Sequence, residues 1–134
     1  MARRLILDTG VLVTSERQKA ALTGRIDAED DVVVAAITVA ELRTGVELAS
    51  DKHHLARTGF LLKVLETMPV EPYDVAVAEA HGRLLTHVHR GGVQRGAHDL
   101  IIAATAVATR RTIVTTDRNA RFEDLPGVDC LVLP

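Results

Sequence analysis

Short apolar runs recur along the chain and are separated by longer stretches with helical spacing. The runs RRLILD (residues 3–8) and DDVVVAAI (30–37) are rich in Leu and β-branched side chains, which predicts buried strands. The same criterion predicts strands at TIVTTD (112–117) and CLVL (130–133). Two prolines limit MPVEP (68–72) to a short strand or an extended connector.

The segments between these runs have the spacing of helices. In the stretch after the second strand, Val39, Leu42, Val46 and Ala49 share one helical face. Asp74 has the features of an N-cap. A turn is expected at TGV after residue 8, and the glycine-rich GGVQRG (91–96) predicts a loop. Helices are predicted at residues 16–28, 38–50, 52–67, 75–90 and 99–109, the last apolar on every side as in a buried helix.

Strands that alternate with helices predict an α/β fold with a mainly parallel sheet and helices on both faces. The chain has 134 residues, 47% of them hydrophobic, which suits one domain over residues 1–134 with a sizeable core. The single cysteine, Cys130, and the absence of a secretory leader favour a reducing, cytoplasmic setting. No apolar run approaches the length of a membrane span, so a soluble protein is expected.

The formal net charge of −2 hides an uneven distribution of charge. Seven arginines and two acids lie between residues 83 and 121, a local balance of +5. About half of these arginines are expected to be ordinary surface or helix-end cations, as at Arg110 and Arg111. Arg95 and Arg118 are the candidates for contact with phosphate groups of a nucleic acid.

Four carboxylates are expected along one edge of the predicted sheet. Asp8 and Asp117 end predicted strands, and Glu41 and Asp99 fall in the first turns of predicted helices. In open α/β sheets, functional sites lie beyond the carboxyl ends of the strands. Like charges about 4 Å apart repel by roughly 1 kcal/mol in water and by more inside a protein. A hard divalent ion such as Mg²⁺ or Mn²⁺ would offset this repulsion, and metal-dependent phosphodiester hydrolysis is the chemistry that follows.

Each acid also has a purely structural interpretation. Thr38 and Glu41 have the spacing of a capping box, and Asp99 could complement a helix N-terminus. Asp8 and Asp117 could cap the turns that follow them. The functional hypothesis is favoured because four independent caps would not be expected to follow the same sheet edge.

The four acidic segments resemble the four successive motifs of PIN-domain ribonucleases. The matching segments are LILDTGVLV around Asp8, ITVAELRTG around Glu41, HDLIIAATA around Asp99 and IVTTDRNARFEDLPGV around Asp117. More narrowly, the whole chain resembles the VapC toxins of bacterial type II toxin–antitoxin systems. The resemblance implies a PIN-like α/β/α sandwich with four to five strands and Mg²⁺- or Mn²⁺-dependent endonucleolytic cutting of RNA. It also implies a homodimer and inhibition by a small VapB-type antitoxin.

By motif, the resemblance makes Asp8 and Asp99 the principal metal ligands. Glu41 would support the metal or a water, Asp117 would complete the acidic set, and Thr115 would help to hold the site together. The chain departs from the pattern at Gly10, where many members have Ser or Asn, and at Arg121, where an acid or Asn is frequent.

Other functions fit the sequence less well. A haloacid-dehalogenase-like phosphatase needs a second acid two residues after Asp8, where Gly10 stands. A receiver domain needs a lysine late in the chain, but none follows Lys63. A flap-type nuclease needs more chain for threading its substrate. A catalytically silent PIN-like module that binds RNA or protein is the remaining alternative, although all four acids are present.

Overall fold

Parallel strands form the centre of the protein in a computed structural model that describes residues 2–18 and 26–134. Within this part of the chain the sheet has five strands in the order β3-β2-β1-β4-β5, and every neighbouring pair is parallel. The predicted α/β fold with a mainly parallel sheet is therefore confirmed. The strands are β1 (Arg4–Leu7), β2 (Asp31–Ala35), β3 (Val70–Glu71), β4 (Thr112–Thr115) and β5 (Asp129–Val132).

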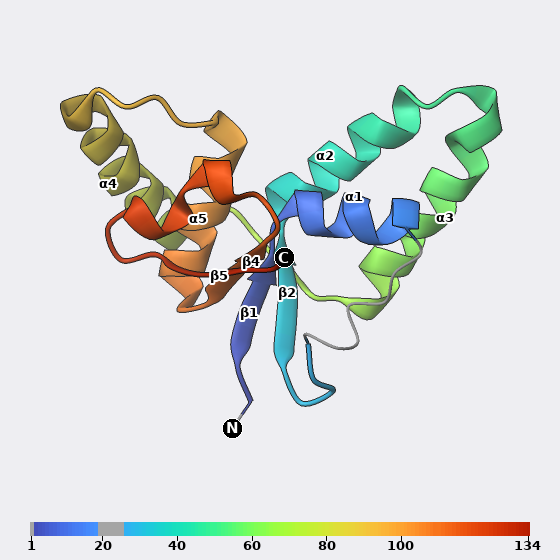
Figure 1. The fold of residues 1–134 in the computed structure, drawn as a ribbon, viewed down its shortest axis with the longest axis horizontal. Coiled ribbons are helices and arrows are strands. Elements are labelled where there is room, and N and C mark those ends of the chain that lie inside the picture. Colours follow the sequence, from blue (N-terminus) through green and yellow to red (C-terminus); the bar gives the residue numbers. More distant parts are fainter. Residues whose placement is uncertain (1, 19–25) are drawn as a thin grey trace.

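Helices cover both faces of this sheet and extend beyond its carboxyl edge as two arms (Figure 1). One arm contains the α2–α3 pair, with α1 beside it, and the other contains the α4–α5 pair. None of the helices in the described ranges is long and apolar enough to cross a membrane. The helices are α1 (Thr9–Gln18), α2 (Ala36–Glu47), α3 (Asp51–Thr67), α4 (Val75–Gly91) and α5 (Ala97–Thr109).

Alternate residues of the strands pack into two separate hydrophobic cores, one on each face of the sheet. Ile6, Val33 and Ile113 pack with α4 and α5, where the buried side chains include five from α5 itself. Their chain neighbours Leu7 and Val34 pack with α1, α2 and α3 on the opposite face. This alternation is the period-2 geometry of a strand with both faces covered, and it explains why the strands are apolar throughout.

The first helix differs most from its prediction. The sequence predicted a turn after residue 8 and a helix at 16–28, but α1 begins at Thr9, directly after the strand. Its backbone starts with a bond from Val11 N–H to the carbonyl of Asp8 at 3.0 Å. Residues 26–30 form bends and turns, and the rest of the predicted helix (19–25) lies outside the described residues. Burial of Val11 and Leu12 outweighs the weak helix propensity of this glycine- and β-branched-rich segment.

The second helix also begins earlier than predicted. The apolar run at 30–37 contains both the end of β2 and the first residues of α2, which starts at Ala36. Periodicity alone does not divide such a run. Glu41 consequently lies beyond the first turn, and Ala49 lies past the end of the helix.

The remaining elements agree closely with the sequence. Asp74 caps α4 by accepting a bond from Val77 N–H at 2.9 Å, as predicted. The helix α5 has no fully exposed residue between Leu100 and Thr109, which confirms the expected buried helix. The short strand β3 is present, but β4 ends at Thr115, two residues before Asp117.

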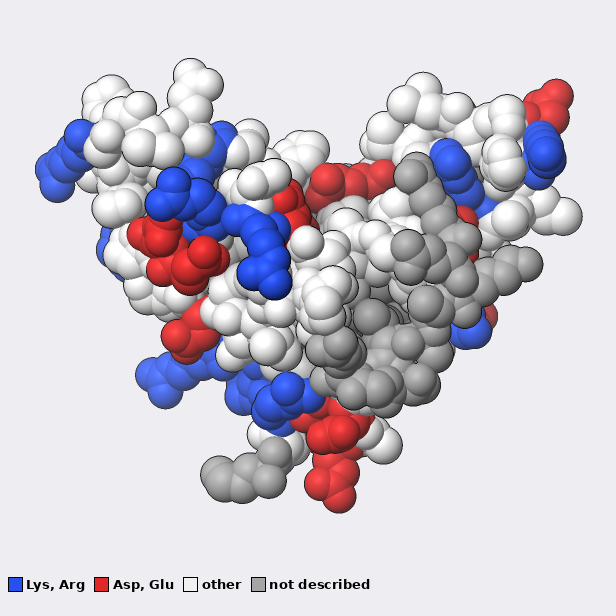
Figure 2. Space-filling model, in the orientation of Figure 1, with Lys and Arg blue, Asp and Glu red and all other residues white. Residues whose placement is uncertain are grey.

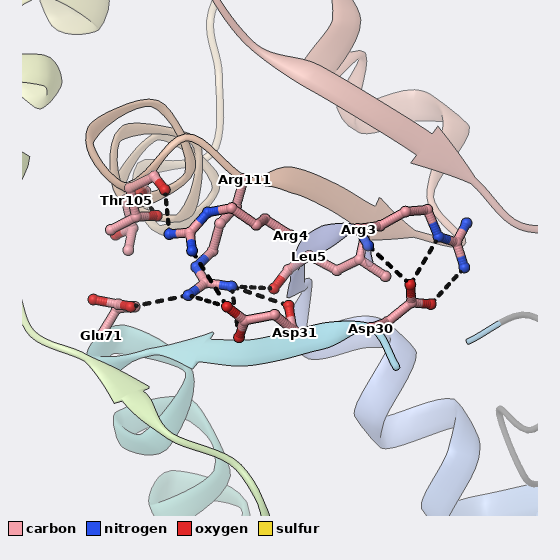
Figure 3. A network of polar contacts seen from close by, with 9 residues as sticks. Arg3, Arg4, Leu5, Asp30, Asp31, Glu71, Thr105 and Arg111 are labelled. Atoms are coloured by element: carbon pink, nitrogen blue, oxygen red, sulfur yellow. Dashed lines mark hydrogen bonds and ion pairs between the residues drawn. The ribbon is translucent and has the colours of Figure 1, made fainter. Parts of the chain in front are cut away.

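A buried arginine, Arg111, connects the strands away from the site (Figure 3). Only 5% of its side chain is exposed, and its guanidinium donates to the backbone carbonyls of Leu5 (3.4 Å) and Asp31 (3.0 Å). It also pairs with the carboxylates of Asp31 (3.2 Å) and Glu71 (3.4 Å). The expectation that Arg111 is an ordinary helix-end cation is therefore wrong, because this side chain ties β4 to β1, β2 and β3.

We expect Arg111→Met to lower the free energy of unfolding by about 1–3 kcal/mol, because two backbone carbonyls lose a donor, Glu71 loses its paired cation and Asp31 loses the more buried of two. Arg4→Met is the matched control, since the Arg4 side chain is half exposed and its pair with Asp31 contributes little. Urea denaturation of both variants measures the difference. Equal stability of Arg111→Met and the unsubstituted protein would contradict the structural role.

Candidate functional site

The carboxyl edge of the sheet reverses its strand order between β1 and β4, and this point carries the first two acids. Asp8 follows β1 directly, and Asp117 lies two residues beyond β4. Crevices at such a reversal are the usual ligand sites of open α/β sheets. The chain direction thus places both carboxylates at the position where a substrate would enter.

Asp8 is the most deeply buried of the four acids, with 7% of its surface exposed. The hydroxyl of Thr115, itself fully buried, donates to Asp8 Oδ2 at 2.8 Å, and Thr115 Oγ1 accepts from Asp117 N–H at 3.0 Å. Burial raises the pKa of Asp8 above its ordinary value, and the charges of Glu41 and Asp117 raise it further, whereas the Thr115 bond opposes this shift. Thr115 therefore orients Asp8 and connects it to the segment that carries Asp117.

Glu41 points toward the same edge from α2. Its Oε1 accepts a bond from Thr9 Oγ1 at 2.8 Å, and Thr9 in turn contacts the buried hydroxyl of Thr38 at 2.9 Å. His98 Nδ1 lies 3.4 Å from the other oxygen, Oε2. The capping-box interpretation is wrong, because α2 begins at Ala36 and its N-cap, Ala35, makes no side-chain bond.

Asp99 lies in the first turn of α5, as predicted. Its pKa is raised to about 6 by burial, with further contributions from the charges of Asp8, Asp117 and Glu41. Gly96 leaves the room that this carboxylate occupies, since a Cβ at that position would come within 3.1 Å of Asp99 Oδ2. The position of Asp99 in the first turn of α5 and the space left by Gly96 together place this carboxylate at the carboxyl edge of the sheet.

Asp117 makes a local bond in addition to facing the other acids. Its side chain accepts from Asn119 N–H at 2.9 Å and caps the short 3₁₀ helix Arg118–Ala120. The structural interpretation of Asp117 as a turn cap is thus confirmed. Its charge nevertheless raises the pKa values of both Asp8 and Asp99, so the cap also belongs to the acidic group.

The surface is hollowed between the two arms (Figure 2). Figure 2 shows acidic side chains reaching the surface at the base of the notch between the α2–α3 arm and the α4–α5 arm. No three Asp, Glu, His or Cys side chains in residues 2–18 and 26–134 are already arranged as a metal cage. An all-oxygen group in which the pKa values of Asp8 and Asp99 are raised suits Mg²⁺, which keeps several waters and binds through one or two carboxylates. Asp8 and Asp99 fit that requirement.

The two arginines proposed for RNA contact differ in their surroundings. One nitrogen of Arg95 donates to the carbonyls of Ala120 (2.7 Å) and Arg121 (2.8 Å), so this side chain holds the loop after Asp117. Arg118 is exposed on that loop. Arg111 lies in the strand network instead.

Sequence reasoning did not identify Thr9 or the contact between His98 and Glu41. Thr9 stands 32 residues from Glu41 in the chain. Its position directly after Asp8 could have indicated that Thr9 lies near the site. Because the sequence predicted a turn at this point, Thr9 was not considered as a partner of the acids.

Comparisons with known proteins agree with this arrangement. The family model of the PIN domain matches residues 5–128. The VapC ribonuclease Y4jK of Sinorhizobium fredii is 35% identical, covering 84% of this chain and 86% of the relative. Ribonuclease VapC5 of Mycobacterium tuberculosis is 30% identical, covering 84% and 82%. A crystal structure of VapBC-5, a toxin–antitoxin system of that organism, contains a chain with a TM-score of 0.81 at 27% identity, covering 97% and 98%.

We expect Asp99→Asn to stabilise the metal-free protein at pH 7. Because the pKa of Asp99 is about 6 in the folded state against 3.8 ordinarily, its contribution to stability is present below pH 4 and is lost as the pH rises through 6. The gain of the variant at pH 7, after allowance for solvent screening, is on the order of 1 kcal/mol and shrinks toward pH 4. Thermal denaturation across this pH range measures it.

Mg²⁺ provides the second part of this test. Millimolar Mg²⁺ should raise the melting temperature of the unsubstituted protein, because an ion bound only to the folded state stabilises it, but should have little effect on Asp99→Asn. A stability difference that does not vary with pH, or an equal response to Mg²⁺, would argue against Asp99 as a metal ligand.

Proposed function

Because the chain belongs to the PIN-domain family and, within it, to the VapC ribonucleases, we propose that it is a metal-dependent endoribonuclease and the toxin of a type II toxin–antitoxin system. The observation that carries the proposal is the convergence of four acids from separate parts of the chain. Their charges act on one another strongly enough to help raise the pKa of Asp99 to about 6. Such repulsion is unfavourable in a purely structural role.

In this proposal Asp8 and Asp99 hold a Mg²⁺ or Mn²⁺ ion, and Asp117 completes the acidic group. The ion, when bound, would neutralise the clustered charge and stabilise the charge that develops on the phosphate oxygens. Thr115 holds Asp8 by its 2.8 Å bond, and Thr9 holds Glu41 by another of the same length. Glu41 is thereby fixed as an acceptor that supports the metal or orients a water for hydrolysis of the phosphodiester bond.

Partners follow from the same family membership. We propose a small VapB-type antitoxin as inhibitor, a homodimer as the assembly and the cytoplasm as the location. The similar chain in the VapBC-5 structure supports the first of these. Exposed apolar side chains offer surfaces for association, among them Leu55 (82% exposed) on α3 and Val75 (76% exposed) on α4.

We expect the purified protein, freed of antitoxin, to cut RNA with Mg²⁺ or Mn²⁺ and to stop when EDTA removes the ion. Asp99→Asn should reduce the cleavage rate at least about a hundredfold, because a ligand of the charge-stabilising ion is lost. Asp129→Asn is the matched control, since this exposed acid starts β5 at the opposite sheet edge. Gel analysis of end-labelled RNA measures the rates.

Two outcomes would contradict the nuclease. Cutting that continues in EDTA or in Asp99→Asn would exclude the metal site as its cause. Binding of RNA or antitoxin without any cutting by the unsubstituted protein would favour the catalytically silent PIN-like module.

The arginines yield a separate expectation. Arg118→Ala should weaken RNA binding to a similar extent for all sequences and lower the salt dependence by about one counterion, because an exposed cation near the site contacts phosphate. Arg95→Ala should in addition disturb the loop that carries Asp117, since Arg95 bonds its backbone. Binding isotherms at several salt concentrations measure both effects. An unchanged salt slope in each variant would remove these residues from the RNA contact.

A further inference from the structure

A recess of about 90 Å³ opens beside the acidic group, between α1, α2 and α3. Val13, Leu42 and Phe60 supply its apolar walls, one from each helix. Glu41 lines it too, so the recess adjoins one of the four carboxylates. A group bound in the recess would therefore lie next to the acidic group.

Two further side chains give the recess opposite hydrogen-bonding properties. Arg57 donates to the carbonyl of Gly45 at 3.3 Å, which holds its guanidinium at the wall, and Glu16 contributes a carboxylate from α1. A guanidinium has five N–H donors, so a single bond to Gly45 leaves donors for a ligand. The recess thus pairs a fixed donor and an acceptor with an apolar surround, as small-molecule and base pockets commonly do.

We propose that this recess receives one base of the RNA beside the cut, and that the base is guanine. Guanine presents O6 and N7 as acceptors on one edge, which suit an arginine, and its N1–H and N2–H groups are donors, which suit a carboxylate. Arg57 and Glu16 are its specificity-determining residues. This proposal rests on the proposed ribonuclease function, because it names the part of the substrate that the site selects.

The position of the recess favours a group of the substrate over a protein partner. A protein contact of useful affinity covers several hundred Å² and is dominated by clustered anchors, whereas this recess is small. It also contains Glu41, whose bond to Thr9 makes it part of the acidic site. We therefore expect the group bound in the recess to be part of the RNA substrate.

Gly45 allows the recess to be filled without disturbing the fold. It lines the recess in the last turn of α2, and a Cβ there would meet no protein atom within 4 Å. Gly45→Leu should therefore occupy the space and raise helix stability. Gly59→Leu is the matched control, because Gly59 is an exposed position in α3 that also has open space for a Cβ and does not line the recess.

The experiment is cleavage of an RNA library with randomised sequence in the presence of Mg²⁺, followed by mapping of the ends. The unsubstituted protein should enrich guanine about tenfold at one fixed position near the cut, as a bidentate base contact would. Gly45→Leu and Arg57→Ala should lose this enrichment while still cutting the library, and Gly59→Leu should keep it. Thermal denaturation shows that each variant is folded.

Three results would overturn the proposal. Cutting without base preference, or a preference that both variants retain, would mean that the recess does not select a base. Retained preference together with weaker antitoxin binding by both variants would assign the recess to the protein partner. No cutting by the unsubstituted protein would reject the proposed ribonuclease function itself, a failure distinguishable from loss of base preference alone.

Discussion

Repulsion among four carboxylates at one edge of a parallel sheet is the constraint around which this protein is built. Burial and neighbouring charges raise the pKa of Asp99 to about 6, so the acids destabilise the fold near neutral pH unless another charge offsets them. Their positions must therefore be enforced by the rest of the molecule. The parallel sheet does this by ending β1 and β4 side by side at the point where the strand order reverses.

Two hydrogen bonds from threonine hydroxyl groups fix the orientation of two of these carboxylates. Thr115 is fully buried and holds Asp8, whereas Thr9 links Glu41 to the buried Thr38. Both contacts orient a carboxylate without neutralising it, so the negative charge remains available to a cation. The apolar helix α5 performs the same task for Asp99 by packing, since it has buried residues on nearly every side. Favourable interactions elsewhere in the fold, including the contacts of Arg111, offset the free energy that the clustered acids cost.

Much of the site was predictable because sequence position and sheet direction are tightly related. Asp8 and Asp117 follow strands, and parallel strands necessarily bring their carboxyl ends to one edge. Asp99 was predictable because an isolated acid begins a buried helix. The placement of Glu41 was predicted less well, since the apolar run before it gave no sign of where β2 ends and α2 begins. The functional roles of all four acids remain predictions that cleavage assays test.

The sequence by itself determined the alternation of elements, the buried nature of α5 and the identity of the four acids, because these depend on local pattern and chain direction. Tertiary structure alone decided that α1 starts at Thr9 and that Thr9 holds Glu41, 32 residues further along the chain, because no local pattern records that bond. The motif around Asp117 had implied a supporting role for Thr115, but its bond to Asp8, 107 residues away, is visible only in the fold. The recess between α1, α2 and α3 arises for the same reason, since its walls come from three helices whose packing is set by burial rather than by local propensity.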